Sequence, residues 1–347
     1  MSPPARAPLL AWYDLHKRDL PWRRTRDPYA IWVSEIMCQQ TRVETVIPYW
    51  ERFLARFPNA TTLAQADEDD VLALWSGLGY YRRARLLHRG VKEVVERYGG
   101  DVPEDREARL SLPGVGRYTA GALGSIAFGL EEPVVDGNVM RVLSRVHGVD
   151  TPLGQKHTET VLWGHAARWV RGPRPGDLNQ AIMELGARVC VPKRPRCDLC
   201  PIAGACVARA TERTDELPVP KAKKPPRPVT MVAVVPCRGC DEVALARGEA
   251  ALFGGLYGVP MIEGAGRDAA LEALRAAKVR ARLDREPSGT VEHVLSHRRL
   301  RVTVYRATRS VVRDPGPTRR LLRFDALDEV GISTLTRKLI QVVRSPS

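Results

Sequence analysis

The sequence predicts two domains, a mainly α-helical one followed by an α+β one. The 347 residues are too many for one ordinary domain and suit two. Residues 9–210 carry a helical apolar period almost throughout, and a proline- and lysine-rich stretch, LPVPKAKKPPRP, then has the composition of an extended linker. After the linker the pattern changes to short strands. We therefore expect a helical domain at 1–215, a linker at 216–228 and an α+β domain at 229–347.

Two helix starts can be predicted in the N-terminal domain. Asp27 has the side chain of an N-cap, and Pro28 suits the first helical position. Thr41 and Glu44 have the spacing of a capping box, which predicts a second helix beginning just after Thr41.

The C-terminal domain mixes strand and helix patterns, as an α+β fold requires. Alternating or continuous β-branched runs predict strands, and longer amphipathic runs predict helices. The predicted strands are Val229–Val235, Val243–Ala246 and the alternation around 302–304, and the predicted helices are Arg267–Ala277 and Thr334–Val343.

The chain is strongly basic. Lys and Arg number 54 against 40 for Asp and Glu, a net charge of +14 that favours a polyanionic partner. No run reaches the roughly 18 apolar residues of a membrane span, and the first residues lack a secretory cleavage pattern. We expect a soluble intracellular protein that does not bind membranes, located in the cytoplasm and associated with the nucleoid if bacterial.

Four of the seven cysteines have the spacing of a metal site. Their pattern is C-x6-C-x2-C-x5-C, and the spacing alone leaves tetrahedral zinc and an iron–sulfur cluster both open. We expect Cys38 to be a core thiol on an apolar helix, and Cys237 and Cys240 to lie in a hairpin turn. The candidate metal ligands are Cys190, Cys197, Cys200 and Cys206.

A Gly-x-Gly turn joins two helical stretches within the string Leu112–Ala120. Gly114 and Gly116 let the backbone approach a ligand closely, and the following helix directs N–H groups at an anion. In a basic chain the expected anion is a DNA phosphate.

Several strings together resemble the helix-hairpin-helix DNA glycosylases related to endonuclease III, and among these the adenine DNA glycosylases of the MutY type. The resemblance is dense over residues 9–210 and looser afterwards. It implies the helix-hairpin-helix fold and a 4Fe–4S cluster on the four spaced cysteines, which decides between zinc and iron–sulfur by resemblance alone. Besides the hairpin and the cysteine spacing, the matching strings are Leu20–Arg23, Val33–Thr41, Gly77–Tyr81, Val135–Val139 and Asn179–Gly186.

Two carboxylates are candidates for breaking a glycosidic bond, which requires a proton for the leaving base and stabilisation of a cationic sugar. Glu35 lies in an apolar helix, where burial should raise its pKa and keep it protonated. Asp136 precedes a predicted helix start, where an ionised carboxylate is favoured. The resemblance makes Glu35 the general acid at adenine N7 and Asp136 the group that stabilises the sugar cation.

Tyr118 occupies the position at which the bifunctional relatives carry a lysine. A phenol cannot form the Schiff base that the lysine amine forms, so we expect base removal without comparable lyase chemistry. By resemblance, Tyr118 and Asn138 orient Asp136.

The target base must leave the helical stack before any acid can reach it. The resemblance implies that Gln40 and Tyr80 enter the duplex to fill the gap. It also implies an adenine pocket and contacts with the DNA backbone. The pocket residues are Trp22, Arg23 and Glu184, and the further DNA contacts are Thr41, Gly114 and Gly116.

The second domain resembles the Nudix-like C-terminal domain of the same family. A working Nudix hydrolase needs several closely spaced glutamates, but the helix at 267–275 has one, which disfavours pyrophosphatase activity. By resemblance this domain recognises 8-oxoguanine through the loop Leu295-Ser296-His297, in which leucine replaces the aromatic residue of some members.

We therefore predict a monofunctional DNA N-glycosylase of base excision repair, a hydrolase that acts as a monomer on double-stranded DNA. Its substrate would be adenine mispaired with 8-oxoguanine or guanine. One alternative is a thymine or uracil mismatch glycosylase or a lyase of the same superfamily. Another is a non-catalytic DNA-binding protein that uses the cluster for structure or electron exchange.

Overall fold

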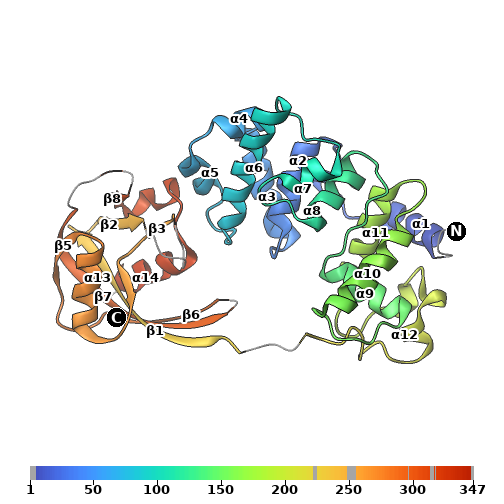
Figure 1. The fold of residues 1–347 in the computed structure, drawn as a ribbon. Coiled ribbons are helices and arrows are strands. Elements are labelled where there is room, and N and C mark those ends of the chain that lie inside the picture. Colours follow the sequence, from blue (N-terminus) through green and yellow to red (C-terminus); the bar gives the residue numbers. More distant parts are fainter. Residues whose placement is uncertain are drawn as a thin grey trace. The chain divides into compact units, whose positions relative to one another are not determined.

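The structure, a computed structural model, describes residues 5–221, 225–247, 255–295, 297–312, 316 and 318–344. Contacts divide these residues into two compact units (Figure 1). The first unit holds the described residues up to Gln65 and those from Leu86 to Lys221. The second holds Ala66–Arg85 together with the described residues from Pro225 onward.

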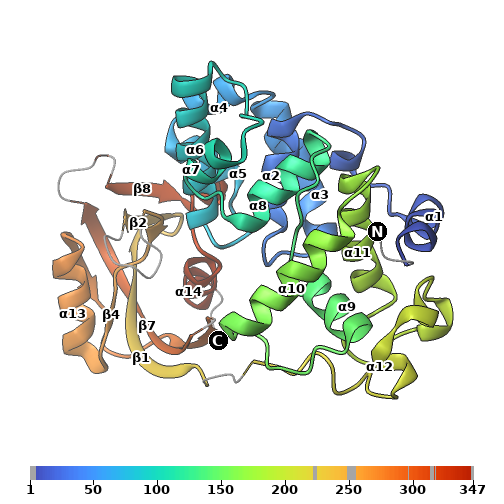
Figure 2. The same cartoon turned by 45° about the vertical axis from the view of Figure 1, so that its right-hand side comes forward.

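The first unit is helical, as the sequence predicted (Figure 2). Its core is built on fully buried aromatic side chains, among them Trp32, Phe53 and Trp169. Three short helical turns, η1, η3 and η4, have the tighter 3₁₀ geometry, and η2 is a π-type turn. The elements are α1 (Arg6–His16), η1 (Pro21–Arg23), α2 (Pro28–Cys38), α3 (Val43–Arg56), α4 (Ala60–Gln65), α6 (Arg82–Tyr98, which begins in the second unit), α7 (Arg106–Ser111), α8 (Arg117–Ala122), η2 (Leu123–Ala127), α9 (Gly137–His147), α10 (Lys156–Trp169), α11 (Pro175–Arg188), η3 (Cys197–Leu199), η4 (Ala203–Ala205) and α12 (Val207–Ala210).

One of the two predicted helix starts is confirmed in detail. Asp27 caps α2 by accepting a hydrogen bond from the Tyr29 amide, and Pro28 is the first helical residue. The predicted capping box is wrong, although a helix does begin there. Arg42 takes the N-cap position of α3 and offers no side-chain hydrogen bond, because the chain makes a turn through Gln40 and Thr41 before the helix starts.

The Gly-x-Gly turn lies between α7 and α8, as predicted. Gly114 has φ of +79°, and a Cβ on it would lie 2.7 Å from Leu86 Cβ, so a larger residue would be both strained and blocked. Gly116 is exposed, and a Cβ there would meet nothing within 4 Å. The second glycine therefore faces open space, where a ligand could approach the backbone.

The second unit is built on an eight-stranded sheet. Its centre is the parallel pair β1 and β7, with Val229 opposite Leu300 and Ala233 opposite Val304. The predicted strands and helices of this region are confirmed within a few residues. The elements are α5 (Glu68–Leu74), β1 (Arg227–Arg238), β2 (Glu242–Arg247), β3 (Tyr257–Gly258), β4 (Met261–Glu263), α13 (Gly266–Ala276), β5 (Val279–Leu283), β6 (Gly289–Val294), β7 (Arg298–Val312), β8 (Arg319–Arg323), η5 (Phe324–Glu329) and α14 (Thr334–Arg344).

The sheet is covered on both faces. Along β1, Met231 and Val235 point to one face and pack with Leu339 of α14. Val232 and Val234 point to the other face and pack with Leu274 of α13. Figures 1 and 2 show the two helices on opposite sides of the central strands. Because successive side chains alternate between faces, the apolar run of β1 serves both cores.

The grouping of residues 66–85 with the C-terminal part was not predicted. The Tyr81 hydroxyl donates a 2.6 Å hydrogen bond to the Ile332 carbonyl, and the Arg337 guanidinium donates to the Ser76 hydroxyl at 3.2 Å. The predicted linker, 216–228, begins with residues that pack on the first unit, and residues 222–224 lie outside the described part. The three domain bounds stay a prediction.

None of the helices in the described residues has both the length and the apolar composition of a membrane span.

Candidate active site

One open groove in the first unit gathers most of the predicted site residues. Its volume is about 880 Å³, within the roughly 300–1,000 Å³ of small-molecule sites, so it could hold a small molecule or one group of a larger one. It is lined by residues from η1, α2, the hairpin, α9 and α11. The predicted residues that line it are Trp22, Arg23, Glu35, Gln40, Thr41, Gly114, Gly116, Tyr118, Asp136, Asn138 and Glu184.

Glu35 projects from α2 into this groove. Its helix neighbours Val33, Ser34 and Ile36 are buried, as the sequence suggested, while Glu35 itself keeps partial access through the groove. Burial raises the pKa of Glu35 to about 7, with the negative charge of Asp136 adding to the effect. Near neutral pH a large fraction of this carboxyl group therefore carries a proton that it can donate.

Tyr118, at the start of α8, contacts Glu35 directly. Its hydroxyl donates a 2.8 Å hydrogen bond to Glu35 Oε2 and lies 3.4 Å from Met183 Sδ. Burial raises the pKa of Tyr118 well above its ordinary value, so the phenol stays neutral and acts as the donor. This hydrogen bond favours the ionised form of Glu35 and limits the rise of its pKa.

Replacing Tyr118 by phenylalanine should therefore raise the pKa of Glu35 further. If protonated Glu35 drives the reaction, the pH at which the rate begins to fall should then be higher by roughly half to one pH unit, as expected for one lost hydrogen bond. The measurement is the pH profile of single-turnover base release for Y118F and wild type. Tyr98, which does not line the groove, supplies the matched control Y98F. A profile of Y118F that coincides with wild type would contradict the coupling.

Asp136 is the N-cap of α9. Its Oδ1 accepts from the Val139 amide at 2.7 Å, and its Oδ2 accepts from Asn138 Nδ2 at 3.2 Å. Burial raises the pKa of Asp136, and these two hydrogen bonds oppose the rise because they favour the ionised form. Asn138 thus contacts Asp136 as predicted from resemblance, whereas the Tyr118 hydroxyl bonds Glu35 and not Asp136.

Arg141 holds Asn138, the partner of Asp136, and no sequence pattern predicted this role. Its guanidinium donates to Asn138 Oδ1 at 2.8 Å, to the Gly186 carbonyl at 2.7 Å and to the Cys190 carbonyl at 2.7 Å. A Cβ on Gly186 would lie 2.7 Å from Asn138 Cβ, so only glycine lets α11 come this close. The same arginine therefore contacts the Asp136–Asn138 pair and the first cysteine of the metal motif.

Glu184 is buried on α11 and anchors two arginines in the groove. It accepts hydrogen bonds from Arg18 at 2.8, 3.1 and 3.3 Å and from Arg23 at 2.9 Å. Burial disfavours its ionisation, but the hydrogen bonds from Arg18 and the charge of Arg23 outweigh burial and lower its pKa. Each carboxylate oxygen already accepts two donors, which fills its usual capacity. Glu184 therefore fixes Arg18 and Arg23, which face the groove.

Trp22 and the turn after α2 complete the groove. The Trp22 ring packs edge-on against Trp50, with 5.9 Å between ring centroids. Gln40 has φ of +57°, an uncommon backbone for a residue with a side chain. The expectation of a core thiol at Cys38 is wrong, because Cys38 is the last residue of α2 and its partly exposed side chain lines the groove.

Four predicted site residues belong to the second unit. Tyr80 lies in the turn before α6, is 51% exposed and has φ of +50°. Leu295 and His297 lie in the turn between β6 and β7, where the Leu295 amide donates to the Arg298 carbonyl. Leu295 packs on the core beneath α14, and His297 is exposed. Ser296 lies outside the described residues.

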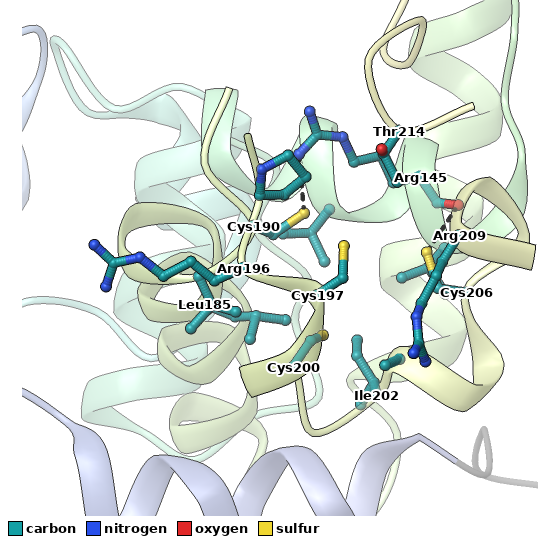
Figure 3. A pocket seen from close by; sticks show the side chains of 15 residues that line it. Arg145, Leu185, Cys190, Arg196, Cys197, Cys200, Ile202, Cys206, Arg209 and Thr214 are labelled. Carbon is teal, nitrogen blue, oxygen red and sulfur yellow. Dashed lines mark hydrogen bonds between the residues drawn. The ribbon is translucent and has the colours of Figure 1, made fainter. Parts of the chain in front are cut away.

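The four spaced cysteines line one small cavity, of about 20 Å³, between α9, α11 and the loop that follows α11 (Figure 3). Arg145 of α9 is buried beside them. It donates to Cys190 Sγ at 3.3 Å and to the carbonyls of Val191 and Pro192, at 2.8 and 3.0 Å. A buried guanidinium among neutral acceptors favours a negative group next to it, such as thiolates bound to metal.

The positions of the four thiols help to decide between zinc and an iron–sulfur cluster. Among the described residues, no group of three or more Cys, His, Asp or Glu side chains is placed to hold a single metal ion. Zinc needs four sulfurs within about 2.3 Å of one atom. Four thiols that line one cavity without converging on a single-ion site suit a cluster of several metal atoms better, so the residues present fit an iron–sulfur group.

Comparison with known proteins identifies the family. Residues 33–167 match the HhH-GPD superfamily of base excision DNA repair proteins, and residues 231–342 match the NUDIX domain. The solved structure of a thermostable thymine-DNA glycosylase is 30% identical, with a TM-score of 0.54, over 59% of this chain and 94% of that one. The chain belongs to the HhH-GPD superfamily. The predicted fold class, a helical HhH-GPD region followed by an α+β Nudix-like region, is confirmed.

The chain is also similar to two curated relatives. It is 49% identical over 221 residues to the human adenine DNA glycosylase, covering 61% of this chain and 40% of that protein. It is 35% identical over 387 aligned positions to the Arabidopsis thaliana adenine DNA glycosylase, covering 96% of this chain and 60% of that protein. The chain thus spans less than two thirds of the length of either relative.

Proposed function

We propose that the protein is a monofunctional adenine DNA glycosylase of base excision repair. The main support for this proposal is that Glu35, Tyr118 and Asp136 line the same groove. The pKa of Glu35 is raised to about 7, and the Asp136 carboxylate accepts hydrogen bonds from two donors. The similarity to the curated adenine glycosylases supports adenine as the base.

The two carboxyl groups have different roles in the reaction. Protonated Glu35 donates its proton to N7 of the extruded adenine, and the bond between the sugar C1′ and N9 breaks with its electron pair going to the base. Ionised Asp136 stabilises the positive charge that develops on the sugar. A water molecule then attacks C1′ and loses a proton to the Glu35 carboxylate, which restores the acid.

Arg18 and Arg23, which line the groove, would recognise the extruded base. Because Arg18 and Arg23 occupy the oxygens of Glu184, their orientation is fixed before the base arrives. Trp22, which is largely buried, also lines the groove. Tyr118 carries no amine, so the protein should release the base and leave the DNA strand intact.

The cavity between α9, α11 and the loop after α11 would hold a 4Fe–4S cluster on Cys190, Cys197, Cys200 and Cys206. When bound, such a cluster folds the loop that carries it and can exchange electrons. The exposed Lys193, on that loop, would contact the DNA backbone.

Elemental analysis of the purified protein should give about four iron and four sulfide per chain, with a brown colour. C197S should lose most of both, since it removes one ligand. C240S, at an exposed cysteine outside the motif, should keep them. About one zinc per chain and no sulfide would contradict the cluster.

The second unit would recognise 8-oxoguanine opposite the adenine, through the turn at Leu295, Ser296 and His297. The helix that a Nudix hydrolase needs for its glutamates corresponds to α13, which has Glu272 alone, so pyrophosphate hydrolysis is not part of the proposal. We further propose that the protein acts as a monomer on double-stranded DNA, in the cytoplasm or at the nucleoid.

A panel of mispaired duplexes tests the choice of base. We expect release from adenine opposite 8-oxoguanine and opposite guanine, and no release from thymine or uracil opposite guanine. Preferred release of thymine or uracil would favour the mismatch enzymes that the thymine-DNA glycosylase represents. Binding to all duplexes with no base release would favour a non-catalytic protein.

A further inference from the structure

The turn between α5 and α6 presents an exposed aromatic ring on a strained backbone. Gly77, Gly79 and Tyr80 have φ of 103°, 72° and 50°. This conformation suits glycine but is costly for a tyrosine. Tyr80 is also 51% exposed, and it is the single aromatic residue among the exposed large hydrophobic side chains in the part of the chain that the structure describes. Neither feature helps the protein to fold, which points to a function for the ring.

The buried Arg83 supports this turn through hydrogen bonds to its backbone. Its guanidinium donates to the Leu78 and Gly79 carbonyls, at 3.4 and 3.2 Å. It also lies 5.3 Å from the centre of the Tyr80 ring and 5.6 Å from that of the Trp75 ring. Arg83 is 8% exposed, and the fully buried Trp75 places its own N–H 3.2 Å from the same Gly79 carbonyl. One buried cation thus contacts both the backbone of the turn and the ring that the turn presents.

Tyr81 fixes the turn from its other side. Its hydroxyl donates to the Ile332 carbonyl at 2.6 Å and accepts from the Gly77 amide at 3.3 Å. Tyr81 is buried, so the two tyrosines of this sequence differ in role: Tyr81 packs inside and Tyr80 faces out.

We propose that Arg83 is a positioning residue that holds Tyr80 ready to enter the DNA base stack, with Tyr81 as the second anchor. The inference rests on the proposed function, in which a base must leave the helix and its place must be filled. A ring fixed in advance loses little conformational freedom on insertion, which lowers the barrier to base extrusion. The planar guanidinium can lie against a ring while it donates to two carbonyls, a geometry that the compact ammonium of lysine does not reproduce.

The test compares R83K, Y80A and the double variant in single-turnover release of adenine from the 8-oxoguanine mispair. We expect R83K to slow release about tenfold, the loss expected for hydrogen bonds from a charged donor. In the Y80A background the same substitution should have little further effect, because Arg83 acts through Tyr80. R82K, at the exposed neighbouring arginine, is the matched control and should match wild type. Equal slowing by R83K with and without Tyr80 would overturn the proposal.

A second readout follows base extrusion directly. With 2-aminopurine beside the target adenine, wild type should give a rise in fluorescence on binding, and R83K a smaller one, since fewer bases are unstacked. If R83K proves unstable, Y81F removes one hydroxyl from the other anchor and should lower the signal in the same direction. An undiminished rise in both variants would contradict a positioning role.

A third measurement does not depend on catalysis. Amide hydrogen exchange at Gly79–Tyr81 in the free protein should be faster in R83K than in R82K, because the turn has lost its support. Equal exchange would overturn the proposal even if adenine release is confirmed. If wild type releases no adenine, the proposed function is wrong, and the exchange comparison still decides whether Arg83 fixes the turn.

Discussion

Replacing Glu35 by glutamine should reduce adenine release by about 10²–10⁴-fold, the usual contribution of a general acid. Glutamine has nearly the same shape and still accepts the hydrogen bond from Tyr118, but it has no proton to donate to the base. Binding of the mispaired duplex should stay within a few-fold of wild type, because the substitution removes no phosphate contact. The measurement is single-turnover base release with a parallel titration of binding.

The wild-type pH profile sharpens the same prediction. Because burial raises the pKa of Glu35 to about 7, the proton donor is present below that pH and is lost as the pH rises through it. Release should therefore fall above neutral pH, and E35Q should lack this limb. E51Q, at an exposed glutamate of α3 outside the groove, makes the same glutamate-to-glutamine substitution and should keep wild-type activity. Loss of DNA binding in E35Q would show that Glu35 has another role.

Replacing Asp136 by asparagine should lower adenine release by about 10²–10³-fold while leaving the protein stable. The structure gives Asp136 two tasks, capping α9 and facing the groove with a negative charge. Asparagine caps a helix about as well as aspartate, so the first task survives. The second is lost, because a neutral amide cannot stabilise the cationic sugar, and removing one such electrostatic partner typically costs this much. Thermal unfolding and single-turnover release, measured together, separate the two tasks.

Asp105 supplies the control. It caps α7 by accepting a 2.8 Å hydrogen bond from the Ala108 amide, but it lies outside the groove. D105N should leave both stability and release near wild type. If D136N unfolds at a much lower temperature than D105N, its loss of activity would reflect a structural role and not the chemistry.

How well the sequence predicts the site depends on how far apart along the chain the contacting residues lie. The apolar surroundings of Glu35 follow from its neighbours on its own helix, and the cap at Asp136 follows from the residues next to it. Both are local patterns, and the structure bears them out. Arg18 gave no such signal, because its partner Glu184 lies 166 residues away, and the contact of Arg141 with Cys190 spans 49 residues.

Two of the predictions that failed did so for different reasons. The capping box near Thr41 had the right spacing, but the chain turns through Gln40 with a positive φ and the helix starts later. The grouping of residues 66–85 with the C-terminal part depends on Tyr81 and Ile332, which are 251 positions apart. Patterns within one segment cannot predict such pairs, since these depend on how the whole chain folds.

The most direct test of the central claim is the product formed from a duplex that carries one labelled adenine opposite 8-oxoguanine. We expect free adenine and an abasic strand that remains whole until it is treated with alkali. Strand cleavage without alkali would contradict hydrolysis without lyase chemistry, and an intact strand with no adenine released would contradict the proposed function itself.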